Sequence, residues 1–129
     1  MAKKTAQVIF VCICSALLLS HPCYAKEKIT YTAKQGSAQR EPKPESCEIQ
    51  VLKDSKPEEY VELGIINYHE ERHRANSGPL KLDVAMPKIK AFACKVGGDA
   101  LIDIRVTEVR RLEFAMFNVR ATVVKFSPK

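Results

Sequence analysis

The chain has 129 residues and carries 21 Lys and Arg against 15 Asp and Glu, for a net charge of +6 at pH 7. This length is enough for one small domain with a modest core. Charges of both signs are interspersed, which is typical of a solvated surface and provides no basic block of the kind that binds nucleic acid.

The first 25 residues have the pattern of a secretory signal peptide. Two lysines precede an almost unbroken apolar run over residues 8–19, and Ala25 offers a small residue for cleavage. The run is short for a membrane span, so an uncleaved anchor is the alternative. Cys23 is not preceded by the leucine of a lipidation box, and we expect it to leave with the leader. Loss of the two leader lysines would reduce the net charge from +6 to +4.

Cleavage of this leader predicts a periplasmic or secreted protein, with peripheral attachment to the outer membrane as a variant of that location. In an oxidising compartment, the two remaining cysteines, Cys47 and Cys94, are expected to form one disulfide. Two buried free thiols are the alternative. Neither cysteine belongs to a Cys-x-x-Cys pair, so redox catalysis is not expected.

Residues 26–45 are polar and contain prolines, which predicts a disordered linker. A single α+β domain is expected over residues 46–129, with one helix packed on a small antiparallel sheet of about four strands. Gly64 is predicted to mark a bulge or a point of close packing. The strands expected from period-two alternation cover residues 47–52, 60–68, 100–109 and 112–126.

Apolar residues at helical spacing predict a helix over residues 83–96, and Asp83 is expected to cap its start. A start at Pro87 is the alternative. Gly97 and Gly98 can supply the left-handed residue that ends a helix.

The last two predicted strands should form an antiparallel hairpin. In the first of them, alternation places Ile102, Ile104 and Val106 on one face. In the second, five apolar residues fall on one face and are expected to form part of the core. These five residues are Ala115, Phe117, Val119, Ala121 and Val123.

Residues 69–73 match the His-Glu-x-x-His zinc signature. On a helix, His69 and His73 would share a face and could bind one zinc ion, with Glu70 as the general base. The context is unfavourable, because a predicted strand precedes the motif, helix-stopping residues follow it and no third ligand is evident. We therefore predict that residues 68–80 form a charged loop or a short helical turn, and keep zinc as the alternative.

Four arginines, Arg105, Arg110, Arg111 and Arg120, are candidates for a basic strip on the predicted hairpin. Such a strip could contact anionic lipid headgroups or an acidic partner. Outward-facing, solvated side chains are the simpler interpretation.

Three segments share one resemblance: Cys47-x-Ile49-x-Val51, residues 62–66 and residues 90–102. They resemble the corresponding parts of the RcsF-like and YbjQ-like small bacterial envelope domains. The resemblance spans residues 46–126 and is strongest where the helix ends, at Gly97-Gly98-Asp99-Ala100-Leu101-Ile102. It implies a helix on an antiparallel sheet behind a disordered tether, and a binding or sensing role without catalysis.

Two functional hypotheses follow. The first is a non-enzymatic periplasmic or envelope-associated module that docks to another envelope protein or assembly and needs no cofactor. The second is a zinc-binding protein or small metallohydrolase that uses His69, Glu70 and His73.

Overall fold

The computed structural model describes residues 25–37, 40–73 and 81–128. The predicted leader, apart from Ala25, lies outside these residues. The elements are β1 Ala25–Ala33, β2 Gln50–Val51, β3 Tyr60–His73, α1 Leu82–Lys95, β4 Ala100–Arg110 and β5 Phe114–Phe126.

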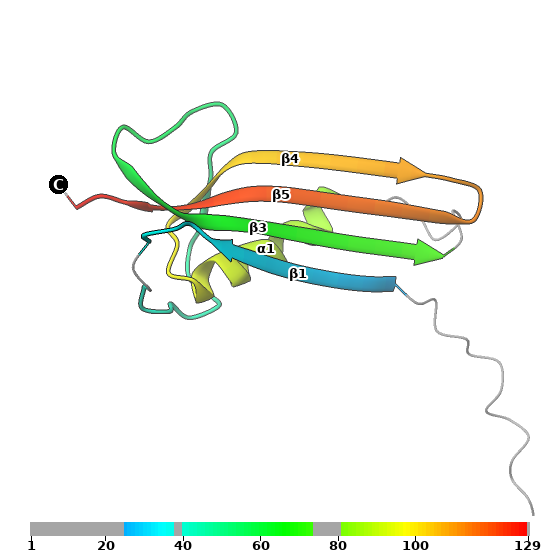
Figure 1. The fold of residues 1–129 in the computed structure, drawn as a ribbon, viewed down its shortest axis with the longest axis horizontal. Coiled ribbons are helices and arrows are strands. Elements are labelled where there is room, and N and C mark those ends of the chain that lie inside the picture. The colour runs from blue at the N-terminus through cyan, green and yellow to red at the C-terminus, as the bar shows by residue number, and fades with distance from the viewer. Residues whose placement is uncertain (1–24, 38–39, 74–80, 129) are drawn as a thin grey trace, which may run out of the picture.

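The strands form one five-stranded sheet in the order β1-β3-β5-β4-β2 (Figure 1). All neighbours are antiparallel except β2 and β4, which are parallel over two residues. The predicted α+β class is confirmed, although the structure is mostly β. The prediction of an antiparallel sheet of about four strands is wrong, because the sheet is mixed and has five.

The first strand, β1, lies where we expected a disordered linker. Residues 25–33 pair with β3 along their whole length, from Ala25 opposite Arg72 to Ala33 opposite Gly64. This edge strand buries little, and its lysines and threonines are exposed. Such a polar edge discourages pairing with other chains and, in sequence, resembles a tether. The linker prediction is therefore wrong for residues 26–33, whereas the described part of residues 34–45 forms no helix or strand.

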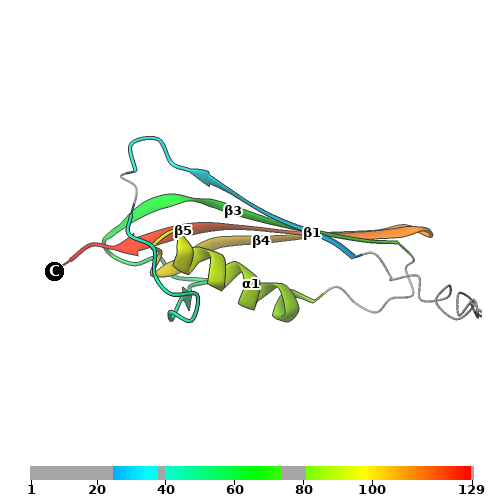
Figure 2. The ribbon, with the colours of Figure 1, turned by 90° about the horizontal axis from the view of Figure 1, so that it is seen from below.

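Helix α1 packs against one face of the sheet, and the long strands extend beyond it (Figure 2). It begins and ends within one residue of the predicted bounds. Lys81 is the N-cap and makes no side-chain capping bond, so the prediction that Asp83 caps the helix is wrong. Asp83 instead lies in the first turn, where a negative charge favours the helix dipole. The buried helix residues, Ala85, Ile89, Ala93 and Cys94, pack with the five predicted core residues of β5.

The helix ends at the predicted glycine pair. Gly97 has a φ of 80°, and its N–H donates to the Cys94 carbonyl over 2.9 Å. A Cβ added at Gly97 would lie 2.8 Å from the Arg40 Cβ and 2.9 Å from the Glu41 carbonyl oxygen. Positive φ and close approach thus both require glycine at this position.

We expect Gly97→Ala to lower the free energy of unfolding by about 3 kcal/mol, since it combines left-handed strain with a clash. Gly36 is the matched control. It has a φ of 79° and nothing within 4 Å of an added Cβ, so Gly36→Ala incurs only the conformational cost. Urea denaturation of both variants measures the difference. Equal losses would show that the contact with residues 40–41 is unimportant.

A bulge in β4 changes the faces predicted for this strand. The register shifts between Ile102 and Arg105, and Asp103 adopts a φ of 51° within the shift. Ile102 pairs with Thr122 of β5, and Arg105 pairs with Arg120. Ile102 and Arg105 consequently face the same side of the sheet. The prediction that Ile102 and Val106 share a face is wrong, because the extra residue reverses the alternation.

Asp99 joins three segments at the start of β4. Its carboxylate accepts hydrogen bonds from the Lys43 ammonium and, over 2.9 Å, from the Phe126 backbone N–H. Burial raises the pKa of Asp99, but these two donors outweigh burial and hold its pKa below the ordinary value of 3.8.

A depressed carboxyl pKa stabilises the fold above the unfolded-state pKa, and that stabilisation is lost as the pH falls through the folded-state value. We therefore expect wild type to be more stable than Asp99→Asn at pH 7. The difference should shrink below about pH 3.8, the ordinary value. Urea denaturation of both proteins across this range tests the prediction, which a pH-independent difference would contradict.

Candidate functional site

The His-Glu-x-x-His motif lies in an extended strand. Strand β3 continues to His73, so the prediction of a loop or helical turn is wrong for residues 68–73. The rest of that predicted loop, residues 74–80, lies outside the described residues. In a strand, positions four residues apart are separated by about 13 Å. Two histidines that share a zinc ion must each place a nitrogen about 2 Å from the metal.

The motif also divides between the two faces of the sheet. His69 and His73 stand opposite Asn118 and Phe114, whereas Glu70 stands opposite the core residue Phe117. Glu70 therefore faces α1, and the histidines face the other side. Among the described residues, no group of three or more His, Cys, Asp or Glu could hold a metal ion. The assignment of Glu70 as a base beside a zinc held by both histidines does not fit this geometry.

Glu70 is a buried structural carboxylate. Its side chain is 3% exposed and accepts hydrogen bonds from the Tyr68 hydroxyl at 3.0 Å and from the Arg72 Nε at 2.5 Å. Burial, and then the Glu70 carboxylate, raise the pKa of Tyr68, so its hydroxyl stays protonated and donates.

Cys47 and Cys94 lie at disulfide distance, with 2.00 Å between the sulfurs, as predicted. The pair joins the segment before β2 to the last turn of α1. The Lys43 backbone N–H also donates to the Cys94 carbonyl, at 2.9 Å. The arrangement is structural, because it fastens an irregular segment to the helix.

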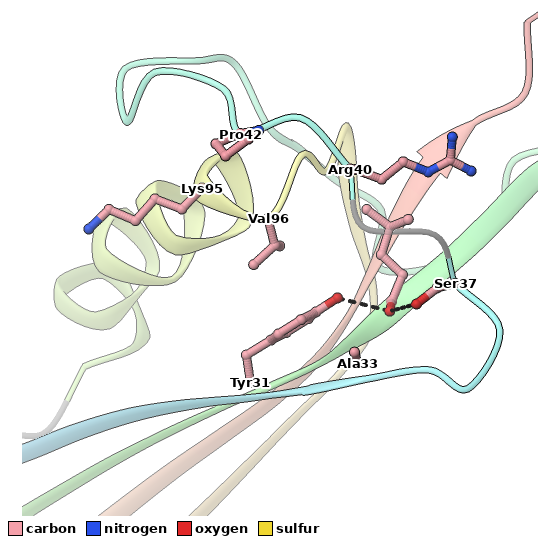
Figure 3. A pocket seen from close by; sticks show the side chains of 8 residues that line it. Tyr31, Ala33, Ser37, Arg40, Pro42, Lys95 and Val96 are labelled. Atoms are coloured by element: carbon pink, nitrogen blue, oxygen red, sulfur yellow. Dashed lines mark hydrogen bonds between the residues drawn. The ribbon is translucent and has the colours of Figure 1, made fainter.

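A crevice of about 370 Å³ lies between the end of α1 and the end of β1 (Figure 3). The hydroxyls of Tyr31 and Ser37 both donate to the Leu63 carbonyl, over 2.8 Å and 3.2 Å. Lys95 forms an ion pair with Glu45 at 2.6 Å. Arg40 also lines the crevice, and its buried Nε has no hydrogen-bond partner among the described residues. Apart from Arg40, the polar side chains named here already bond to other parts of the protein, which leaves few groups to orient a ligand.

The face of the sheet opposite α1, which we call the open face, has a different character. Pairing places two rows of side chains side by side across β1, β3, β5 and β4. All eight residues are polar and none is acidic, and we call them the donor band. The donor band consists of Lys28, His69, Asn118 and Thr107 in one row and Thr30, Asn67, Arg120 and Arg105 in the next.

Two arginines of the donor band stand directly opposite each other. Arg105 and Arg120 are cross-strand partners in the β4–β5 hairpin, and both are exposed. Like charges in this position destabilise a sheet. Within the described part of the chain, neither arginine forms an ion pair, and neither does Lys28.

The predicted strip of four arginines is divided by the structure. Arg110 stands opposite Ala115 on the face that packs against α1, and it forms an ion pair with Glu108. Arg111 lies beyond the end of β4, at the tip of the hairpin. Only Arg105 and Arg120 come together, because the β4 bulge turns Arg105 to the open face.

The donor band contains a hollow of about 210 Å³. Its lining includes Lys28, Thr30, Asn67, His69, Asn118 and Arg120. The His69 Nδ1 donates to the Asn118 side-chain oxygen over 2.6 Å. From the sequence, His69 was a candidate zinc ligand and Arg120 part of the predicted arginine strip, and the other residues of the lining were not candidates for any site. Only the pairing register brings these residues together.

Comparison with family models, with curated proteins and with solved structures finds no match to this chain. Among the described residues, no helix is long and apolar enough to cross a membrane.

Proposed function

We propose that the protein is a non-enzymatic binding module of the bacterial envelope, and that its open face docks to an acidic surface of another envelope protein or assembly. The adjacent Arg105 and Arg120 carry this proposal. Their repulsion costs folding free energy, and an anionic partner would offset that cost.

Location is part of the same proposal. The leader-like first 25 residues favour export, and the Cys47–Cys94 pair suits an oxidising compartment. We propose that the exported protein is periplasmic or secreted, or associates with the periphery of the outer membrane. The likeness to RcsF-like and YbjQ-like domains agrees with a binding role.

Arg105→Glu tests the proposal. The new carboxylate stands opposite Arg120 and pairs with it, which removes the repulsion and withdraws Arg120 from a partner. We expect the free energy of unfolding to stay the same or rise by up to about 1 kcal/mol. Docking should nevertheless be lost.

Docking is measured in cells with a photo-cross-linking amino acid at Thr107, on the open face. A second strain carries it at Asp83, an exposed residue of α1 on the other side of the sheet. We expect one dominant product from Thr107 and none from Asp83. Arg105→Glu should abolish the product from Thr107. Arg111→Glu, which makes the same charge change at the hairpin tip, should leave that product unchanged. A product that survives Arg105→Glu, or one formed only from Asp83, would refute docking through the open face.

A further inference from the structure

We infer that the hollow in the donor band is a binding site for a phosphate group. This goes beyond the proposed docking, because the hollow can hold a phosphate whether or not a protein covers the rest of the open face. The ligand class is a phosphate ester, either a soluble one or the headgroup of a lipid.

The chemistry of the lining favours an anion with several acceptor oxygens. Lys28, Thr30, Asn67, Asn118 and Arg120 all carry hydrogen-bond donors, and no carboxylate lines the hollow. The bond from His69 occupies the Asn118 side-chain oxygen and leaves the amide NH₂ group to donate elsewhere.

The placement of the two cations also fits. Lys28 on β1 and Arg120 on β5 stand on either side of β3. Adjacent strands are about 4.8 Å apart, so roughly 10 Å separates these two backbones. Both side chains are long enough to reach a group seated over Asn67 between them.

Charge and size select phosphate over a carboxylate. A phosphate monoester carries about −1.5 to −2 charges and three acceptor oxygens, which match two cations and several neutral donors. A carboxylate has one charge and two oxygens. The volume of about 210 Å³ accommodates a phosphate together with the first atoms of its ester group.

The nearest acid on this face lies outside the lining of the hollow. Glu71 lies one row beyond the hollow, 4.0 Å from the His69 Nε2 and 3.9 Å from the His73 Nε2. Its charge therefore falls beside the histidines. Lys26 shares that outer row with Glu71 and lies two residues from Lys28 on the same face of β1, which makes it a matched control.

The test is an NMR titration of the ¹⁵N-labelled protein, isolated after export, at constant ionic strength. The probes are inorganic phosphate, glycerol 3-phosphate, and phosphatidylcholine vesicles with and without phosphatidic acid. We expect phosphate to shift the side-chain amide signals of Asn67 and Asn118. Lys28→Gln and Arg120→Gln should each weaken binding about tenfold, and Lys26→Gln by less than about twofold.

Shifts with the soluble probes would support a site for soluble phosphate esters. A response confined to vesicles that contain phosphatidic acid would support a headgroup site. No response to any probe would overturn the inference. It would also be overturned if Lys26→Gln weakened binding as much as Lys28→Gln, because the effect would then be that of general positive charge. Docking and phosphate binding have separate readouts, the cross-link from Thr107 and the side-chain amide signals of Asn67 and Asn118, so either proposal can fail while the other holds.

Discussion

Removal of the disulfide is expected to lower the free energy of unfolding by about 4 kcal/mol, the chain-entropy value for a cross-link that spans 47 residues. Domains of this size are stabilised by about 5–15 kcal/mol in total, so the double variant Cys47→Ala/Cys94→Ala should be close to unfolding at 37 °C. The cost is large because the cross-link closes a long loop and so restricts the conformations open to the unfolded chain.

Urea denaturation should compare the double variant with wild type in the presence and absence of a reductant. Reduced wild type keeps both sulfur atoms, so it separates loss of the cross-link from loss of packing around Cys94, which is fully buried. If reduced wild type stays within about 1 kcal/mol of the oxidised protein, the cross-link contributes little and the entropy estimate fails here.

The second large effect is expected at the buried pair of Glu70 and Arg72. Arg72→Met leaves a carboxylate that is 3% exposed without its cationic partner, and we expect a loss of about 3 kcal/mol. Replacing both residues, as Glu70→Gln/Arg72→Met, should recover part of that loss because the buried charge is removed as well.

The chain provides a matched control for this pair. Arg110 and Glu108 have the same two-residue spacing in a strand and the same Nε-to-carboxylate contact, but their side chains are 46% and 36% exposed. Arg110→Met should therefore cost less than about 1 kcal/mol. Equal losses for the two arginines in urea denaturation would show that burial does not set the value of the Glu70–Arg72 pair.

These variants also bear on the zinc hypothesis. Replacing a catalytic general base usually costs little stability. Glu70 instead accepts hydrogen bonds from two donors in the core, so its replacement should destabilise the fold. The His-Glu-x-x-His motif binds zinc only on a helix, whereas the residues before it favour a strand. The alternation of Ile66, Tyr68 and Glu70 continues the strand, and Glu70 takes a core position since Arg72 and Tyr68 satisfy it.

Local features of the sequence were sufficient for α1, for its glycine stop and for the core face of β5. Each of these depends on interactions within one segment: a helical apolar stripe, a left-handed residue at Gly97, and strict alternation over residues 115–123. The pairing of Cys47 with Cys94 could also be predicted from the sequence, because only two cysteines remain outside the predicted leader.

Tertiary structure alone decided β1, the bulge in β4 and the donor band. The polar residues of β1 become a strand because β3 supplies their hydrogen bonds, and this edge position demands no apolar pattern. The bulge at Asp103 shifts the pairing of β4 with β5, and it places Arg105 opposite Arg120. The donor band draws its residues from four strands, of which only β4 and β5 are consecutive in sequence, so its chemistry exists only once the strands have paired.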